Sequence, residues 1–249
     1  MKETLKQDLQ SMVCIGNTAK LPTARLNNYP ELRKTLIKAC GKYKRNTFEF
    51  LYPAKVIINK LVSGVTIDFK KEFQFFTTPP QLAENMVDQF YFEKAVLDCL
   101  EPSGGHGVLI DALLNRNQIT KNFDVIELSE LNEAVLRDKY SHLGTQVMIT
   151  KGDFLKIEFS KKYDLIIANP PFSKNQDIDH IKKMYSLLND TGQLVTISSK
   201  SWFQGSQKKQ VEFKHWLEND VCADLYDLDQ GTFKSSGTNV SGMLIAIRK

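Results

Sequence analysis

The sequence has few cysteines and histidines, no long apolar run and no signal peptide. Its 249 residues include four cysteines and four histidines, and neither type is clustered, so we expect reduced cysteines and no metal site. No apolar run approaches the roughly 20 residues that a membrane-spanning helix needs. The charged residues 1–10 lack the apolar core of a signal peptide. These absences argue against a secreted, disulfide-stabilised or membrane protein, and we expect a cytoplasmic one.

Positive charge is concentrated near the N-terminus, although the net charge of the chain is only +4. Residues 1–60 carry twelve Lys and Arg against four Asp and Glu. The densest stretch contains Arg33, Lys34, Lys38, Lys42, Lys44 and Arg45, with Tyr43 and Phe48 interleaved. Such asymmetry is typical of a region that contacts a polyanion, but a solvated helix face has a similar composition. Both interpretations stay open at this point.

The apolar pattern divides the chain into a basic, mainly helical N-terminal region, residues 1–70, and a larger domain, residues 71–249. In the larger domain, short apolar strands are predicted at residues 95–100, 123–127, 147–151, 164–168, 193–198, 221–227 and 242–248. Helices are predicted at residues 31–42 of the first region and, between the strands, at 79–90, 107–115, 129–140, 177–189 and 207–218. This alternation predicts an α/β fold whose mostly parallel sheet is covered on both faces, with the last strand antiparallel.

The predicted strand 164–168 leads directly into Asn169-Pro170-Pro171-Phe172. Two prolines prevent both further strand pairing and an immediate helix, so the chain must turn at the carboxyl end of the strand. In an open α/β sheet, ligands bind at that edge. The Asn169 side chain and the Pro170 carbonyl offer two hydrogen-bond acceptors beside the Phe172 ring. This combination suits the exocyclic amine of a planar base.

A second turn, Glu101-Pro102-Ser103-Gly104-Gly105-His106-Gly107, lies between the strand 95–100 and a helix. Its glycines allow the backbone to approach a ligand at the helix N-terminus. Ile110 stands where a dinucleotide-binding fingerprint needs Gly or Ala, which argues against NAD. Glu101 disfavours phosphate and would accept a cationic amino group.

Acidic residues also follow the next two strands. Glu127 can accept hydrogen bonds from ribose hydroxyls, and Asp153 from an adenine amine, with Phe154 packing on the adenine ring. Considered alone, Glu127 could be a helix-capping acid and Asp153 a turn residue. Together with Glu101, they suit a ligand that has an ammonium, a ribose and an adenine but no phosphate. We therefore expect S-adenosylmethionine as the cofactor.

These motifs resemble those of the N6-adenine DNA amino-methyltransferases in which the cofactor motifs precede the catalytic one. The segment 75–83, with Thr77, Thr78 and Pro79, resembles the leading motif that closes over the methionine end of the cofactor. The segments 101–107, 124–127 and 152–154 are similar to the glycine, ribose and adenine motifs, although His106 replaces a smaller residue. Asn169 to Phe172 resembles the catalytic motif. Phe233 follows Gly231-Thr232, as in the motif that supplies a second aromatic ring against the target base.

The resemblance covers about residues 73–249 and implies a class I methyltransferase (Rossmann-like) fold with a seven-stranded sheet. It implies methyl transfer to the N6 amine of a flipped-out adenine in DNA, as in restriction-modification systems, with Phe172 and Phe233 contacting the base. The absence of a Pro-Cys pair argues against methylation of a cytosine ring carbon. Phe172 argues against a glutamine amide of a protein as the substrate.

Two alternatives remain. Similar enzymes modify adenine N6 or guanine N2 in rRNA or tRNA, and a non-catalytic adapter subunit of a modification complex could keep the fold. The sequence ends at the predicted strand 242–248, whereas DNA enzymes of this arrangement commonly carry a target-recognition domain after the catalytic one. We therefore expect sequence readout from residues 1–70, from loops or from a partner, either a specificity subunit or a second copy of the chain, unless readout is weak.

Overall fold

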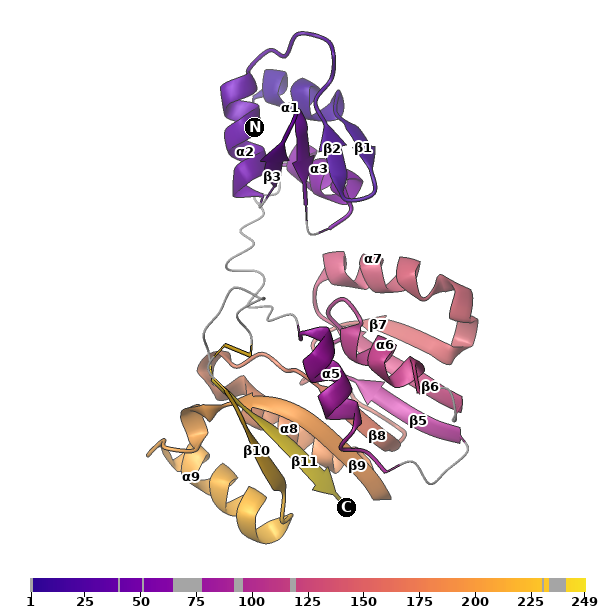
Figure 1. The fold of residues 1–249 in the computed structure, drawn as a ribbon, viewed down its shortest axis with the longest axis vertical. Coiled ribbons are helices and arrows are strands. Elements are labelled where there is room, and N and C mark those ends of the chain that lie inside the picture. The colour runs from indigo at the N-terminus through magenta and orange to yellow at the C-terminus, as the bar shows by residue number, and fades with distance from the viewer. Residues whose placement is uncertain are drawn as a thin grey trace. The chain divides into compact units, whose positions relative to one another are not determined.

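The computed structural model describes residues 2–39, 41–50, 52–64, 78–91, 96–116, 120–229, 231–232 and 241–249 (Figure 1). Its contacts divide the chain into two compact units, residues 1–74 and 75–249, which we call unit 1 and unit 2. The boundary expected at residues 70 and 71 lies outside the described residues. Among the helices of the described ranges, none is long and apolar enough to cross a membrane.

Unit 1 combines helices with a four-stranded antiparallel sheet in the order β1-β2-β4-β3. The described elements are α1 (Glu3–Gln10), β1 (Val13–Ile15), β2 (Thr18–Lys20), α2 (Tyr29–Lys38), β3 (Lys42–Lys44), β4 (Thr47–Glu49) and α3 (Ala54–Val62). The prediction of a mainly helical region missed this sheet, because strands of three residues are too short to show a periodic pattern. The helix predicted over residues 31–42 ends at Lys38, and β3 begins at Lys42.

The sheet of unit 1 has one buried and one exposed face, because successive side chains of a strand point to opposite sides. Ala19 of β2 and Phe48 of β4 are cross-strand partners, and both are fully buried. Tyr43 of β3 continues this row and lies under the guanidinium of Arg33 from α2. Cys14 of β1, the partner of Ala19, lies on the same side as this row. The other eight strand residues form what we call the outer face: Val13, Ile15, Thr18, Lys20, Lys42, Lys44, Thr47 and Glu49. All of them are exposed or half-buried.

Unit 2 contains a seven-stranded sheet in the order β10-β11-β9-β8-β5-β6-β7. Its strands are β5 (Val96–Glu101), β6 (Thr120–Glu127), β7 (Val147–Lys151), β8 (Tyr163–Ala168), β9 (Leu188–Ser199), β10 (Asp224–Leu228) and β11 (Gly242–Arg248). β11 runs antiparallel to both of its neighbours, β10 and β9, whereas the described pairs among β9, β8, β5, β6 and β7 are parallel. The predicted α/β fold with an antiparallel last strand is confirmed.

Helices cover both faces of this sheet (Figure 1). They are α5 (Pro80–Val87), α6 (Val108–Leu114), α7 (Glu130–Lys139), α8 (Gln176–Ser186) and α9 (Lys208–His215), with short turns η1 (Ser141–Gln146), η2 (Ser173–Asn175), η3 (Lys200–Trp202) and η4 (Trp216–Asp220). Leu165 and Ile167 of β8 pack in the core beneath α5, α6 and α7. Ile166 and Ala168 pack in the core beneath α8 and α9. A strand buried on both sides needs an uninterrupted apolar run, which explains the sequence of β8.

Element boundaries differ from prediction most on either side of residue 188. The helix predicted over residues 177–189 ends at Ser186, and β9 begins at Leu188 rather than at residue 193. Asn189 and Asp190 near its start are polar and lie where the register between β8 and β9 shifts, so no strand-like pattern marks them. The strand predicted over residues 221–227 begins at Asp224, because α9 is extended by the turn η4.

Candidate active site

The Asn169–Phe172 turn is fixed at the carboxyl end of β8. Thr196 of the neighbouring strand donates a side-chain hydrogen bond to the Ala168 carbonyl at 3.1 Å. Pro170 is buried, and the half-buried Phe172 packs against the core beneath α5 and α6. The turn is thus held by both the sheet and the helical layer, which limits its freedom to move.

Asn169 contacts Thr78, which lies two residues before the start of α5. Its Nδ2 donates a hydrogen bond to Thr78 Oγ1 at 3.1 Å, although the two residues are 91 positions apart. Because Nδ2 donates to Thr78, the acceptor Oδ1 of the same amide group faces away from Thr78. Pro79 is the N-cap residue of α5. The structure therefore brings part of the leading motif, Thr78 and Pro79, to the catalytic motif, whereas Thr77 lies outside the described residues.

The glycine turn between β5 and α6 is packed too tightly for side chains. Gly104 N donates to the Ile126 carbonyl at 3.0 Å, and a Cβ at Gly104 would lie 2.5 Å from Val125 Cγ1. Gly107 has a φ of +76°, and a Cβ there would lie 2.2 Å from the hydroxyl of Tyr140. That hydroxyl lies 2.7 Å from the Gly107 carbonyl. Gly104 and Tyr140 were not among the predicted site residues, and nothing in the sequence placed Tyr140 next to this turn.

Two buried carboxylates lie beside this turn, at the ends of adjacent strands β5 and β6. Glu127 accepts hydrogen bonds from Gly105 N at 2.7 Å and from Ser129 N at 2.6 Å. Burial raises its pKa, although these two bonds oppose the shift. Glu101 accepts a bond from Ser103 N at 3.1 Å. Burial raises the pKa of Glu101 well above its usual value, and the nearby charge of Glu127 adds to this effect.

Each raised pKa means that the protein alone stabilises these charges poorly, so a cation near Glu101 would be favoured. The Glu127 carboxylate can still accept bonds from hydroxyls, because each of its oxygens has two lone pairs. Pro102 and Ser103 belong to the same turn, with Pro102 buried and Ser103 half-buried. The donor and acceptor set therefore fits an ammonium and a ribose.

Asp153 and Phe154 follow β7 but differ in their surroundings. Asp153 accepts a bond from Leu155 N at 3.1 Å and remains 34% exposed. Phe154 is only 2% exposed, and its ring packs against Phe159 and His180. Core side chains thus contact this ring, and Phe154 anchors the turn that presents Asp153, while packing of Phe154 on the adenine stays a prediction.

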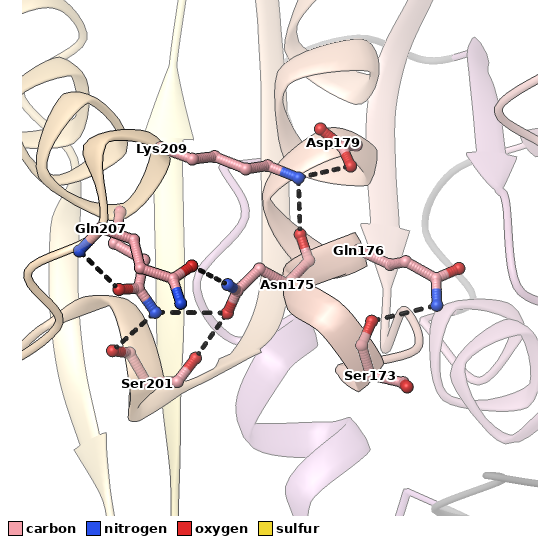
Figure 2. Close-up of polar contacts among 8 residues, drawn as sticks. Ser173, Asn175, Gln176, Asp179, Ser201, Gln207 and Lys209 are labelled. Atoms are coloured by element: carbon pink, nitrogen blue, oxygen red, sulfur yellow. Dashed lines mark hydrogen bonds and ion pairs between the residues drawn. The ribbon is translucent and has the colours of Figure 1, made fainter.

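A polar network joins the segment after the Asn169–Phe172 turn to η3 and α9 (Figure 2). Lys174 and Asn175 both have left-handed backbone conformations, with φ of 55° and 57°. The Asn175 side-chain oxygen accepts a hydrogen bond from Ser201 at 3.0 Å, and its backbone carbonyl accepts one from Lys209 at 3.1 Å. Lys209 also pairs with Asp179 of α8 at 2.6 Å. These contacts hold an otherwise unfavourable backbone in place.

Substitution of Asn175 should separate the contribution of the side chain from that of the backbone. We expect Asn175→Ala to lower the free energy of unfolding by about 2 kcal/mol, because it loses the Ser201 bond and adds left-handed strain. Asn175→Gly loses the bond but relieves the strain, so its loss should be about half as large. Urea unfolding of both variants measures the difference. Equal losses would show that the backbone conformation contributes nothing.

The order of the strands in unit 2, with β11 antiparallel between β10 and β9, is that of the class I methyltransferases. The chain belongs to the methyltransferase small domain family, because the family model matches residues 80–215, more than half of its length. Family and fold together support S-adenosylmethionine as the cofactor.

A curated relative is the type II methyltransferase M.AccI of Acinetobacter calcoaceticus, 30% identical over 119 residues, which is 47% of this chain and 21% of the relative. A structure from Listeria monocytogenes, assigned to the class I S-adenosylmethionine-dependent methyltransferases, aligns with a TM-score of 0.59 at 11% identity, covering 79% of this chain and 66% of that one. A type I restriction-modification methyltransferase subunit of Streptococcus thermophilus gives a TM-score of 0.62 at 15% identity, covering 79% and 53%. The chain thus spans about a fifth of M.AccI and half to two thirds of the two structures.

Proposed function

We propose that the protein transfers the methyl group of S-adenosylmethionine to the N6 amine of adenine in DNA. The observation that carries this proposal is the Asn169–Phe172 turn at the end of β8, with the Asn169 amide oriented by Thr78. The similarity to a type II methyltransferase supports a role in restriction-modification, with DNA as the substrate.

An exocyclic adenine amine is a poor nucleophile, because its lone pair is delocalised into the ring. Asn169 Oδ1 and the Pro170 carbonyl would each accept one amine hydrogen, which favours a tetrahedral nitrogen whose lone pair is available. Pro171 keeps the turn rigid, so that both acceptors are already oriented before the base arrives. When bound, the cofactor supplies a sulfonium methyl group as the electrophile.

The other proposed roles concern binding. Glu101 would hold the ammonium of the cofactor, Glu127 the ribose hydroxyls and Asp153 the adenine amine. Phe172 would stack on the flipped-out base, which returns roughly 1–3 kcal/mol against an unstacking cost of about a few kcal/mol. Phe233, proposed for the opposite face of the base, lies outside the described residues.

Transfer of tritium from labelled S-adenosylmethionine to duplex DNA, single-stranded DNA and RNA tests this function. We expect the label to appear in DNA. After digestion, the labelled nucleoside should be N6-methyl-2′-deoxyadenosine. Label only in RNA would favour the adenine-N6 or guanine-N2 RNA methyltransferase instead. Label in none of the three, with cofactor still bound, would favour the non-catalytic adapter.

A further inference from the structure

The outer face of unit 1 carries three exposed lysines on neighbouring strands. Lys20 lies on β2, and Lys42 and Lys44 lie on the edge strand β3. None of the three forms an ion pair with another described residue. Glu49 is the acidic residue that this face contains, whereas residues 1–60 as a whole carry twelve Lys and Arg against four Asp and Glu. The face is therefore complementary in charge to a polyanion.

The turn between β3 and β4 adds a fourth cation, in a backbone conformation that arginine does not favour. Arg45 and Asn46 have φ of 45° and 63°, and both are exposed. A two-residue hairpin turn with two left-handed residues prefers Asn or Gly. In other residues the left-handed backbone brings Cβ too close to the following carbonyl oxygen. A strained residue without a packing reason points to a role outside the fold. Arg45 is exposed at the turn that ends the hairpin.

Apolar side chains lie on the same face, on the opposite edge strand β1. Val13 is 53% exposed and Ile15 is 75% exposed. β1 and β3 are three strand spacings apart, roughly 14 Å, which is more than the width of one major groove. Val13 and Ile15 therefore lie outside the groove that β3 would face, and the outer face is apolar at one edge and basic at the other.

The geometry favours duplex DNA over duplex RNA. The major groove of B-DNA is about 12 Å wide and admits a two-stranded ribbon, and strands lie about 4.8 Å apart. Because β4 also pairs with β2, the hairpin is one edge of a four-stranded sheet, so the edge strand β3 and the turn with Arg45 are the parts that can face the groove. In A-form RNA the major groove is deep and too narrow for side chains to read.

We propose that the outer face of unit 1 binds duplex DNA, with the edge strand β3 and the Arg45–Asn46 turn facing the major groove. The choice of DNA rests on the proposed function, and the surface would supply substrate affinity that the residues of the methyltransferase site do not. Lys20, Lys42 and Lys44 contact phosphates, and Arg45 reaches the base edges or the flanking backbone.

The test compares two triple variants of the full chain that remove the same charge. Lys20→Gln/Lys42→Gln/Lys44→Gln changes the outer face, and Lys34→Gln/Lys38→Gln/Lys55→Gln changes exposed lysines of α2 and α3. Binding to a labelled duplex of about 30 base pairs is measured between about 50 and 200 mM salt. The outer-face variant should bind roughly tenfold more weakly, and its slope of log affinity against log salt should fall by about 2 to 3. Equal losses in both variants would overturn the proposal.

Arg45→Asn provides a second test that does not depend on fold stability. Asparagine suits the left-handed turn, so the melting temperature should be kept or raised, while affinity for the duplex falls several-fold. Unchanged affinity would contradict the role of the hairpin. Tighter binding of an RNA duplex of the same sequence, or of vesicles of anionic lipid, would overturn the choice of DNA.

Methyl transfer distinguishes failure of this inference from failure of the proposed function. If the outer-face variant labels DNA with an unchanged KM, the inference fails and the function stands. If the wild-type protein binds duplex DNA through the outer face but labels no adenine, the inference stands and the function fails.

Discussion

Replacing Asn169 with alanine should reduce methyl transfer by a factor of at least about 10², because it removes one of the two acceptors that hold the amine. The cofactor should still bind with nearly unchanged Kd, since Glu101, Glu127 and Asp153 are retained. Single-turnover transfer to duplex DNA gives the rate, and calorimetry gives the Kd of S-adenosylmethionine. A large loss of cofactor affinity would contradict the role proposed for Asn169.

Thr78→Val is the matched control for this prediction. Valine has nearly the same shape but cannot accept the 3.1 Å bond from Asn169 Nδ2, so the amide would be free to rotate. We expect an intermediate reduction in rate, with both acceptors still present but one poorly oriented. A rate equal to that of the wild-type protein would show that Thr78 does not position Asn169.

The second large effect is expected at Glu127. Glu127→Gln places an amide NH2 against the N–H of either Gly105 or Ser129, both of which now donate to carboxylate oxygens. The glycine turn should shift, and cofactor affinity should fall by roughly 100-fold, since about 1–3 kcal/mol is lost at each mispaired group. Glu158→Gln, an exposed residue with the same charge change, is the control and should leave the Kd unchanged. Thermal unfolding shows whether the Glu127→Gln variant stays folded. A folded variant with weak binding has a defect in the site, whereas an unfolded one is unstable.

The same two carboxylates determine the expected pH dependence. Burial raises the pKa of both Glu101 and Glu127, so each becomes protonated at a higher pH than an ordinary carboxylate. Because the ammonium of the cofactor prefers an ionised Glu101, affinity should be full above the raised pKa and should fall as the pH decreases through it. A Kd that stays constant down to the usual carboxylate range would contradict this assignment.

Sequence patterns predicted the sheet of unit 2 well because both its faces are buried. In β8 and β11, uninterrupted apolar runs determine the strand, and the predicted range of β11 is the observed one. The strands of unit 1 were missed, because β3 consists of Lys42, Tyr43 and Lys44 and resembles a solvated segment. The pairing of β3 with β4 decides its conformation, and strands of three residues are too short to show a periodic pattern.

The site residues show the same limit. The Asn169–Phe172 turn and the glycine turn could be predicted, because proline and glycine restrict the backbone locally. The Thr78–Asn169 bond and the position of Tyr140 beside Gly107 depend on packing between distant elements. The contacts of the Phe154 ring with Phe159 and His180 depend on such packing as well.

The long separation between Thr78 and Asn169 also bears on how the protein folds. The bond between Gly105 and Glu127 closes a loop of 22 residues, whereas the bond between Asn169 and Thr78 closes one of 91. Loop-closure entropy makes the longer contact about 1 kcal/mol more costly to form early. The half of unit 2 that carries the glycine turn can therefore become ordered from nearby contacts. The half that contains Asn169 and Thr78 acquires its geometry only when β8 has joined the sheet and α5 has docked. Methyl transfer through the proposed site therefore requires cooperative folding of the whole unit.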